Sequence, residues 1–70
     1  MQHSGVSITL NGQHTKLPSN SLKDLIDSSN LENKRFAIEV NKRIVPKSKH
    51  NDFLILDGDN VEIVEAVGGG

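Results

Sequence analysis

Cysteine is absent from this 70-residue sequence, and its aromatic side chains are limited to two phenylalanines. Without cysteine there is no disulfide, thiolate metal site or cysteine nucleophile, and the small disulfide-dependent secreted domains are excluded. A nucleic-acid-binding surface needs a basic stripe with stacking aromatic rings. This chain has a formal net charge of −1, and Phe36 and Phe53 each lie within an apolar run. We therefore expect no nucleic-acid partner.

Long hydrophobic runs are also missing. No segment approaches the ~20 apolar residues of a membrane-spanning helix, so we expect no contact with a membrane. Residues 1–5 are polar and no apolar run follows them, which argues against a signal peptide and favours a cytoplasmic location. A single domain of this length leaves little volume for a deep catalytic pocket. Together these absences favour a protein that is not an enzyme.

Alternation of apolar and polar residues predicts a hairpin at the start of the domain. Segment 6–10 alternates in this way, which is typical of a half-buried strand. Asn11-Gly12 follows directly and is the strongest short signal for a type I′ turn. The return strand is then the polar segment 14–17, which ends before Pro18.

A short amphipathic helix is predicted next. Ser21 with Asp24 three residues later resembles a capping box in which Asp replaces the usual Glu or Gln. An apolar stripe at positions i, i+3 and i+4 lies behind this cap. The stripe consists of Leu22, Leu25 and Ile26. The polar run 28–30 limits the helix to two or three turns, and Leu31 should pack under the core after it.

A second, shorter hairpin should follow the helix. Segment 36–40 alternates as a third strand, and Asn41-Lys42 turns the chain. Segment 43–45 is a brief fourth strand that ends at Pro46, because proline cannot donate to a strand ladder.

Four segments complete the chain. We expect 47–52 to be a loop with one helical turn and 53–56 to be an apolar plug in the core. Segment 57–60 has the composition of a turn, and 61–67 is the most strand-prone part of the sequence.

This order of elements predicts an α+β fold in which one mixed sheet of four to five strands packs on a single α-helix. The first and last strands should be parallel neighbours in the middle of the sheet, which is the ubiquitin-like β-grasp arrangement. We expect residues 1–67 to form this domain, with residues 1–5 a candidate disordered segment. Residues 68–70 should form a flexible tail.

Three glycines follow the last predicted strand directly. Glycine lacks a Cβ atom, so Gly68, Gly69 and Gly70 can thread through a narrow channel that would exclude a side chain. A terminal carboxylate is inert to nucleophiles until it is activated, for example as an acyl-adenylate. A thin tail on a rigid domain suits that chemistry, whereas a terminal Gly-Gly taken alone also fits a frayed end without function.

The last strand and the second turn supply candidate partner-binding residues. Val61 and Ile63 should face the helix, which places Val64 and Ala66 on the outer face of the sheet beside the tail. An exposed apolar patch there would suit a partner, although a central strand also favours valine for its β propensity. Arg43 beside the turn either pairs with acids on a partner or is simply solvated.

We expect neither a metal site nor a catalytic centre. His3, His14 and His50 lack the spacing of metal ligands. Segment 57–60 has too few of the ligands of a calcium loop and predicts a plain turn. Nothing in the sequence marks a nucleophile elbow or a catalytic triad.

Six pieces of the sequence are more specific in their order and spacing than any one of them alone. They are Ile8-Thr9-Leu10-Asn11-Gly12, Leu22-Lys23-Asp24-Leu25-Ile26, Ala37-Ile38-Glu39-Val40-Asn41, Ile44-Val45-Pro46, Leu56-Asp57-Gly58-Asp59 and the segment from Val61 to Gly70. Together they resemble the ThiS-type sulfur carriers of thiamin biosynthesis over most of the chain after residue 7. Two features depart from that family: His50 stands where an aromatic residue is frequent, and the N-terminus is several residues longer than usual.

The resemblance implies a carrier chemistry centred on Gly70. An E1-like adenylyltransferase of the ThiF type would use ATP to adenylate the Gly70 carboxylate, and a persulfide sulfur donor would convert the adenylate to a thiocarboxylate. A thiazole synthase of the ThiG type would then accept the sulfur. The carrier itself would bind no cofactor and catalyse none of these steps, with Gly68 and Gly69 as its threading tail.

Two alternatives stay open. A related β-grasp carrier would use the same chemistry for another acceptor, in molybdopterin synthesis, tRNA thiolation, cysteine synthesis or protein conjugation. The segment Glu65-Ala66-Val67 lacks the aromatic-proline stretch usual in the molybdopterin carrier, which counts against that acceptor. The other alternative is an interaction module whose tail is idle.

Overall fold

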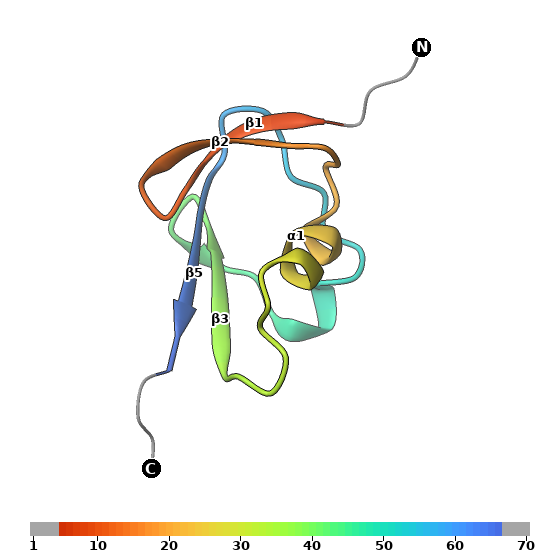
Figure 1. Ribbon diagram of the computed structural model, residues 1–70, viewed down its shortest axis with the longest axis vertical. Helices are drawn as coiled ribbons and strands as arrows, with labels where there is room; N and C mark the ends of the chain where they lie inside the picture. Colours follow the sequence, from red (N-terminus) through yellow and green to blue (C-terminus); the bar gives the residue numbers. More distant parts are fainter. Residues whose placement is uncertain (1–4, 67–70) are drawn as a thin grey trace.

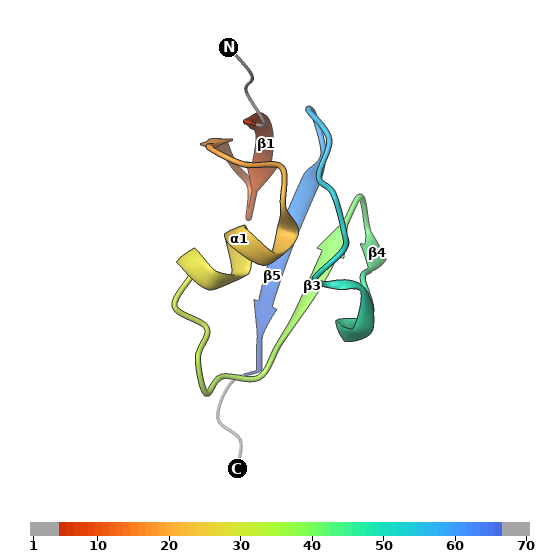
Figure 2. The ribbon, with the colours of Figure 1, turned by 90° about the vertical axis from the view of Figure 1, so that its right-hand side faces the viewer.

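Five strands form one mixed sheet, and a single α-helix packs on one of its faces, in the computed structural model that describes residues 5–66 (Figures 1 and 2). The elements are β1 (Val6–Leu10), β2 (Gln13–Leu17), α1 (Leu22–Ser28), β3 (Phe36–Val40), β4 (Arg43–Ile44), a 3-10 turn η1 (Lys47–Lys49) and β5 (Asn60–Glu65). The strand order across the sheet is β2-β1-β5-β3-β4. The predicted α+β, β-grasp architecture is therefore confirmed.

The middle of the sheet is built from the first and the last strand. β1 and β5 run parallel, with Thr9 opposite Asn60 and Leu10 opposite Val61. β5 also pairs antiparallel with β3, from Phe36 opposite Glu65 to Val40 opposite Val61. β5 consequently has a neighbour on both sides, as the order of elements predicts.

The turn between β1 and β2 has the backbone geometry that its sequence predicts. Asn11 has a φ of 49° and Gly12 a φ of 84°. Positive φ at both central residues is the requirement of a type I′ turn. The Asn11 side chain also reaches across the sheet, because its Oδ1 accepts a hydrogen bond of 2.8 Å from the backbone N of Ile63. The return strand begins at Gln13, one residue earlier than predicted.

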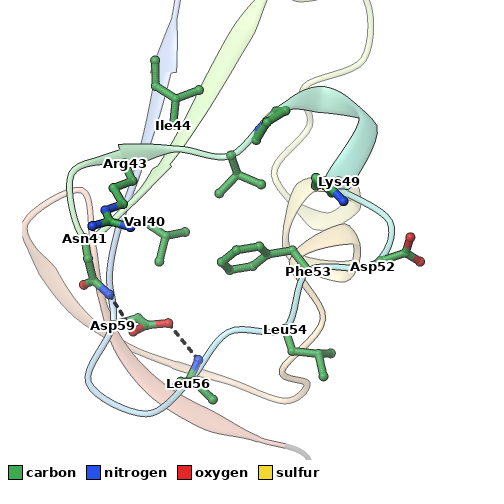
Figure 3. A pocket seen from close by; sticks show the side chains of 12 residues that line it. Val40, Asn41, Arg43, Ile44, Lys49, Asp52, Phe53, Leu54, Leu56 and Asp59 are labelled. Atoms are coloured by element: carbon green, nitrogen blue, oxygen red, sulfur yellow. Dashed lines mark hydrogen bonds between the residues drawn. The ribbon is translucent and has the colours of Figure 1, made fainter.

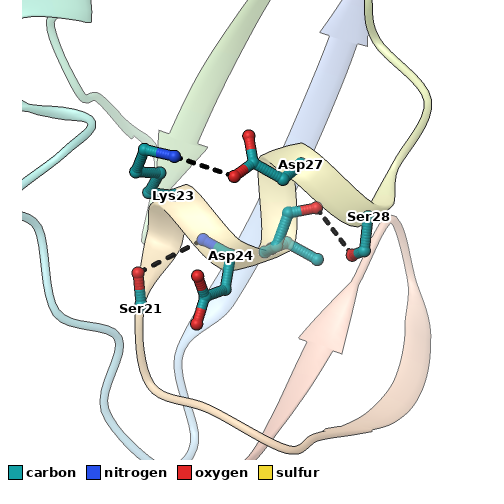
Figure 4. A network of polar contacts seen from close by, with 6 residues as sticks. Ser21, Lys23, Asp24, Asp27 and Ser28 are labelled. Carbon is teal, nitrogen blue, oxygen red and sulfur yellow. Dashed lines mark hydrogen bonds and ion pairs between the residues drawn. The ribbon is translucent and has the colours of Figure 1, made fainter.

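Helix α1 begins with the predicted cap, but only half of the capping box forms (Figure 4). Ser21 Oγ accepts a hydrogen bond of 3.2 Å from Asp24 N. The reciprocal hydrogen bond of a capping box, from Ser21 N to the Asp24 side chain, does not form. Ser21 N donates instead to Ser19 Oγ at 3.0 Å, so this part of the prediction is wrong. On the exposed side of the helix, Lys23 Nζ lies 2.9 Å from Asp27 Oδ2, an i,i+4 ion pair.

The core lies between α1 and the sheet. Leu22 and Leu25 of the helix are buried against side chains from β1, β3 and β5, and Leu31 is also buried, as predicted. The fully buried large side chains are Ile8, Leu22, Ile38, Ile55 and Val61. Burying a side chain of this size contributes about 1.5–3 kcal/mol to stability.

The predicted apolar plug at 53–56 is wrong in part. Ile55 is fully buried, but Leu54 is 60% exposed and Leu56 is 67% exposed. The segment runs extended beside the start of α1, where Leu22 N donates to Phe53 O at 3.1 Å and Ile55 N donates to Asn20 O at 2.7 Å. Successive side chains of an extended segment point to opposite sides, so Ile55 enters the core and its neighbours do not.

The ends of two strands also differ from prediction. β4 ends at Ile44, and Val45 leaves the strand while its N still donates to Ile38 O at 2.8 Å. β5 begins one residue early, at Asn60, and ends at Glu65. The predictions for residues 1–4 and 67–70 lie outside the described residues. Within residues 5–66, no helix has the length and apolar character needed to cross a membrane.

Candidate functional site

The root of the glycine tail is the end of β5, and the loop before β3 holds it in two ways. Ala66 N donates to Arg35 O at 2.9 Å, which extends the β3–β5 pairing by one bond. Lys34 Nζ lies 3.6 Å from Glu65 Oε1. The predicted covalent site, Gly70, and the predicted tail residues Gly68 and Gly69 lie outside the part of the chain that the structure describes. The structure places the end of β5 and Ala66, from which the chain continues toward them.

The outer face of the sheet carries Val64 and Ala66, as predicted. Val61 is fully buried on the helix side, whereas Val64 is 49% exposed and Ala66 is exposed. Val64 lies opposite Ala37 of β3, so the two side chains share the uncovered face. The orientation of these residues is confirmed, and their role in binding a partner remains a prediction.

Arg43 lies apart from the other predicted site residues. It pairs with Val40, which is buried on the helix side, so Arg43 projects to the face opposite Val64. Val40 is four positions along β3 from Phe36, the residue opposite Glu65, and this separation corresponds to about 13 Å of strand. The structure therefore does not bring Arg43 to the root of the tail.

Arg43 instead lines an apolar groove of about 960 Å³ between β4 and the segment 53–56 (Figure 3). Two exposed leucine side chains of the segment 53–56, Leu54 and Leu56, line this groove. Ile44 borders it on β4, but its side chain points away from the two leucines (Figure 3). Asp59 closes one end, where its carboxylate accepts hydrogen bonds from Asn41 Nδ2 at 3.0 Å and from Leu56 N at 2.9 Å. The sequence pattern does not predict this groove, because four consecutive apolar residues at 53–56 indicate a buried segment.

A second hollow, of about 320 Å³, lies on the other side of β4 and near the root of the tail. We call it the basic cleft. Three of its lining residues are lysine or arginine, one is histidine, and none is acidic. The lining residues are Lys34, Arg35, Phe36, Ala37, Ile44, Val45, Pro46, Lys47 and His50. Lys34 and Arg35 are adjacent in the sequence and Lys47 follows Arg35 by 12 positions, so only the fold brings the three together.

His50 is a structural member of this cleft. Its Nε2 lies 3.0 Å from Val45 O, and its ring stacks on Phe36 with 6.1 Å between ring centroids. The imidazole thus occupies the place of a small aromatic ring. Among residues 5–66 no three His, Asp or Glu side chains are grouped to hold a metal ion, and His3 lies outside this range.

Comparison with known proteins gives a consistent result. The model of the ThiS family matches residues 8–70. The chain is 38% identical over 65 residues to the sulfur carrier protein ThiS of Bacillus subtilis strain 168, an alignment that covers 90% of this chain and 98% of that protein. It is also similar to a thiazole synthase of Paramagnetospirillum magneticum, with 30% identity over 93% of this chain but only 20% of that protein.

The fold is similar to a solved structure. The crystal structure of a thiamine biosynthesis protein (ThiS) from Geobacter metallireducens superposes with a TM-score of 0.72 and covers 93% of this chain and 100% of that one. The two sequences are 22% identical, so this likeness supports the fold alone.

Proposed function

The chain belongs to the ThiS family, and on that basis we propose that it is a sulfur carrier for thiamin biosynthesis. The observation that carries this proposal is the family match, which runs from residue 8 through Gly70 and therefore includes all three glycines of the tail. The similarity to a sulfur carrier over nearly the whole of both chains supports the same conclusion.

The proposed chemistry takes place at the Gly70 carboxylate. A carboxylate oxygen attacks the α-phosphorus of ATP in an E1-like adenylyltransferase, pyrophosphate leaves, and an acyl-adenylate forms. The terminal sulfur of a persulfide then attacks the acyl carbon and displaces AMP. Cleavage of the resulting acyl disulfide by a thiol gives the thiocarboxylate, which donates its sulfur to thiazole synthase.

The contribution of the carrier is presentation, and its partners catalyse each step. β5 is paired on both sides in the middle of the sheet, and the Arg35 and Lys34 contacts hold its last residues. When a partner binds the domain, the end of β5 is therefore held in a fixed position relative to the partner. This lowers the entropic cost of placing Gly70 in the partner's active site. Glycine backbone suits the narrow approach to ATP because it has no side chain to exclude.

Intact-mass spectrometry tests the proposal directly. The full chain is incubated with ATP, the adenylyltransferase of the same organism and a persulfide source. We expect a product heavier by the difference between one sulfur and one oxygen atom. The matched control is the chain with Gly70 deleted, which should show no change under the same conditions.

Transfer to the acceptor is the second measurement. The thiocarboxylated chain should form thiazole product with thiazole synthase, and an added alanine after Gly70 should prevent both reactions. Formation of the thiocarboxylate without transfer to thiazole synthase would assign the chain to another acceptor. An unchanged mass, with the adenylyltransferase active on a known carrier, would leave the chain as an interaction module.

A further inference from the structure

The basic cleft is lined by cations and by no acidic residue, and the proposed chemistry at Gly70 gives these cations no role. The chain as a whole has nine acidic residues against eight lysines and arginines. The lining of the cleft nevertheless includes three of those cations and no carboxylate. A concave surface of one sign of charge concentrates ligands of the opposite sign and guides their approach.

The cations of the cleft are available to a ligand. Arg35 and Lys47 are exposed and form no ion pair within residues 5–66. Lys34 has one partner, Glu65, at 3.6 Å, and both side chains are about half exposed. An exposed pair of this kind contributes at most about 1 kcal/mol, so an incoming carboxylate can replace Glu65 at Lys34.

The floor of the cleft is apolar. The Phe36 ring stacked on His50 forms part of it, with Pro46 and the 66% exposed side chain of Ile44 beside them. The cations come from two separate segments, the loop before β3 and the turn η1. This combination fits a peptide segment with acidic and apolar side chains better than it fits a free phosphate.

The cleft also has a fixed relation to the tail. Arg35 lines the cleft and, through its backbone O, holds Ala66 N at 2.9 Å. Phe36 of the floor lies opposite Glu65 at the end of β5. A protein segment bound in the cleft is therefore beside the point where the tail begins, so one partner can hold the domain and the tail together.

We propose that the basic cleft is the docking site for an acidic segment of thiazole synthase, an inference that rests on the proposed function. The choice of partner follows from the similarity to a thiazole synthase of which the matched region is one fifth. In that protein a region resembling this carrier and a region about four times its size share one polypeptide. Charge on the cleft then serves docking, while Gly70 serves the chemistry.

Charge reversal at the cleft provides the test, with purified thiazole synthase of the same organism as the probe. Arg35→Glu and Lys47→Glu change exposed side chains, so the full chain should keep its circular dichroism spectrum and melting temperature. We expect each variant to raise the Kd for the synthase about threefold or more, and the double variant to raise it about tenfold or more. The matched control is Lys16→Glu on β2, at the other edge of the sheet, which should change the Kd less than about twofold.

Salt provides a second readout. The Kd of the unmodified chain should rise with sodium chloride concentration, and this dependence should be weaker for the double variant because it forms fewer charge contacts. Inorganic phosphate at constant ionic strength should compete no better than chloride. Effective competition by phosphate would make the cleft a phosphate site and overturn the proposal.

Formation of the thiocarboxylate separates failure of this inference from failure of the function. If the unmodified chain forms the thiocarboxylate and transfers sulfur while both cleft variants bind the synthase as tightly as it does, docking at the cleft is overturned and the carrier function stands. Weakened binding to the adenylyltransferase alone would also overturn it, because the cleft would then serve the other partner. If the unmodified chain neither forms the thiocarboxylate nor binds the synthase, the proposed carrier function is contradicted, and the docking inference that rests on it is overturned with it.

Discussion

Asn11 stabilises two separate parts of the sheet with one residue. Its backbone adopts the positive φ that the β1–β2 turn requires, and its side chain accepts a hydrogen bond from Ile63 N of β5. Asparagine adopts the left-handed region more readily than other residues with a Cβ atom. The sequence alone explains the first role, while the second depends on a strand that is 52 positions away.

Asn11→Ala should lower the free energy of unfolding by about 1–3 kcal/mol, because it removes the hydrogen bond and leaves alanine at positive φ. Asn11→Gly is the matched control, since glycine accepts the backbone conformation and loses only the side-chain bond. Urea denaturation of the three proteins measures both effects. Equal stability of the alanine and glycine variants would show that the backbone conformation has no cost.

Lys23 provides a prediction about pH. Its hydrogen bond with Asp27, and then the charge of Asp27, raise the Lys23 pKa above its ordinary value of 10.5. The folded protein thus holds this proton more tightly than the unfolded chain. The resulting stability is fully present below pH 10.5 and is lost as the pH rises through the folded-state pKa.

Asp27→Asn should therefore return the Lys23 pKa toward 10.5, which an NMR titration of the lysine side chain measures. Asp24→Asn is the control, because Asp24 is the smallest of the influences on this pKa and its removal should have little effect. A Lys23 pKa that stays raised without Asp27 would contradict the assignment of the cause.

At the scale of the elements, the segment 53–56 shows how one extended stretch serves two environments. Ile55→Ala should lower the free energy of unfolding by about 2–5 kcal/mol, because it leaves a cavity under a fully buried side chain. Leu56→Ala makes a similar truncation at a side chain that is 67% exposed, and it should change stability by less than about 0.5 kcal/mol. Thermal and urea unfolding measure the stability of the two variants. Equal losses of stability would mean that both side chains are buried, as the sequence predicts for 53–56.

The elements could be predicted where a local pattern determines them. The strands β1 and β3 alternate, and Asn11-Gly12 fixes the turn between the first two strands. Segment 53–56 could not be assigned in the same way, because four consecutive apolar residues hide which of them points inward. The capping box failed for a related reason: Ser19 competes for Ser21 N, and a pattern of positions i and i+3 does not consider the residue two positions before the cap.

At the scale of the whole molecule, the inner face of β5 must be apolar because it packs in the core, whereas its outer face tolerates polar side chains. Val61→Thr should destabilise the fold by about 1–3 kcal/mol, because the core offers the buried hydroxyl no ready partner. Val64→Thr keeps the same shape on the outer face and should change stability by less than about 0.5 kcal/mol. Calorimetry of both variants checks the difference. If the outer face docks a partner, Val64→Thr should also weaken partner binding several-fold without unfolding the chain.

The candidate site could be predicted only where it is local in the sequence. The glycine tail and the outward direction of Val64 follow from residues 61–70 alone. The basic cleft requires Lys34 and Arg35 to lie beside Lys47, and the apolar groove requires β4 to lie across from the segment 53–56. These neighbours are set by strand pairing and by the path of the loop after η1, which the sequence pattern does not specify.

The position of β5 between β1 and β3 also determines when this chain folds. β1 is made before β5, its parallel neighbour, so the sheet stays incomplete until β5 is available. Contacts between positions this far apart slow folding, because a long loop must close before the contact forms. Ile8 and Ile38 therefore cannot be fully buried until β5 pairs with β1 and β3, and the same step places Glu65 opposite Phe36.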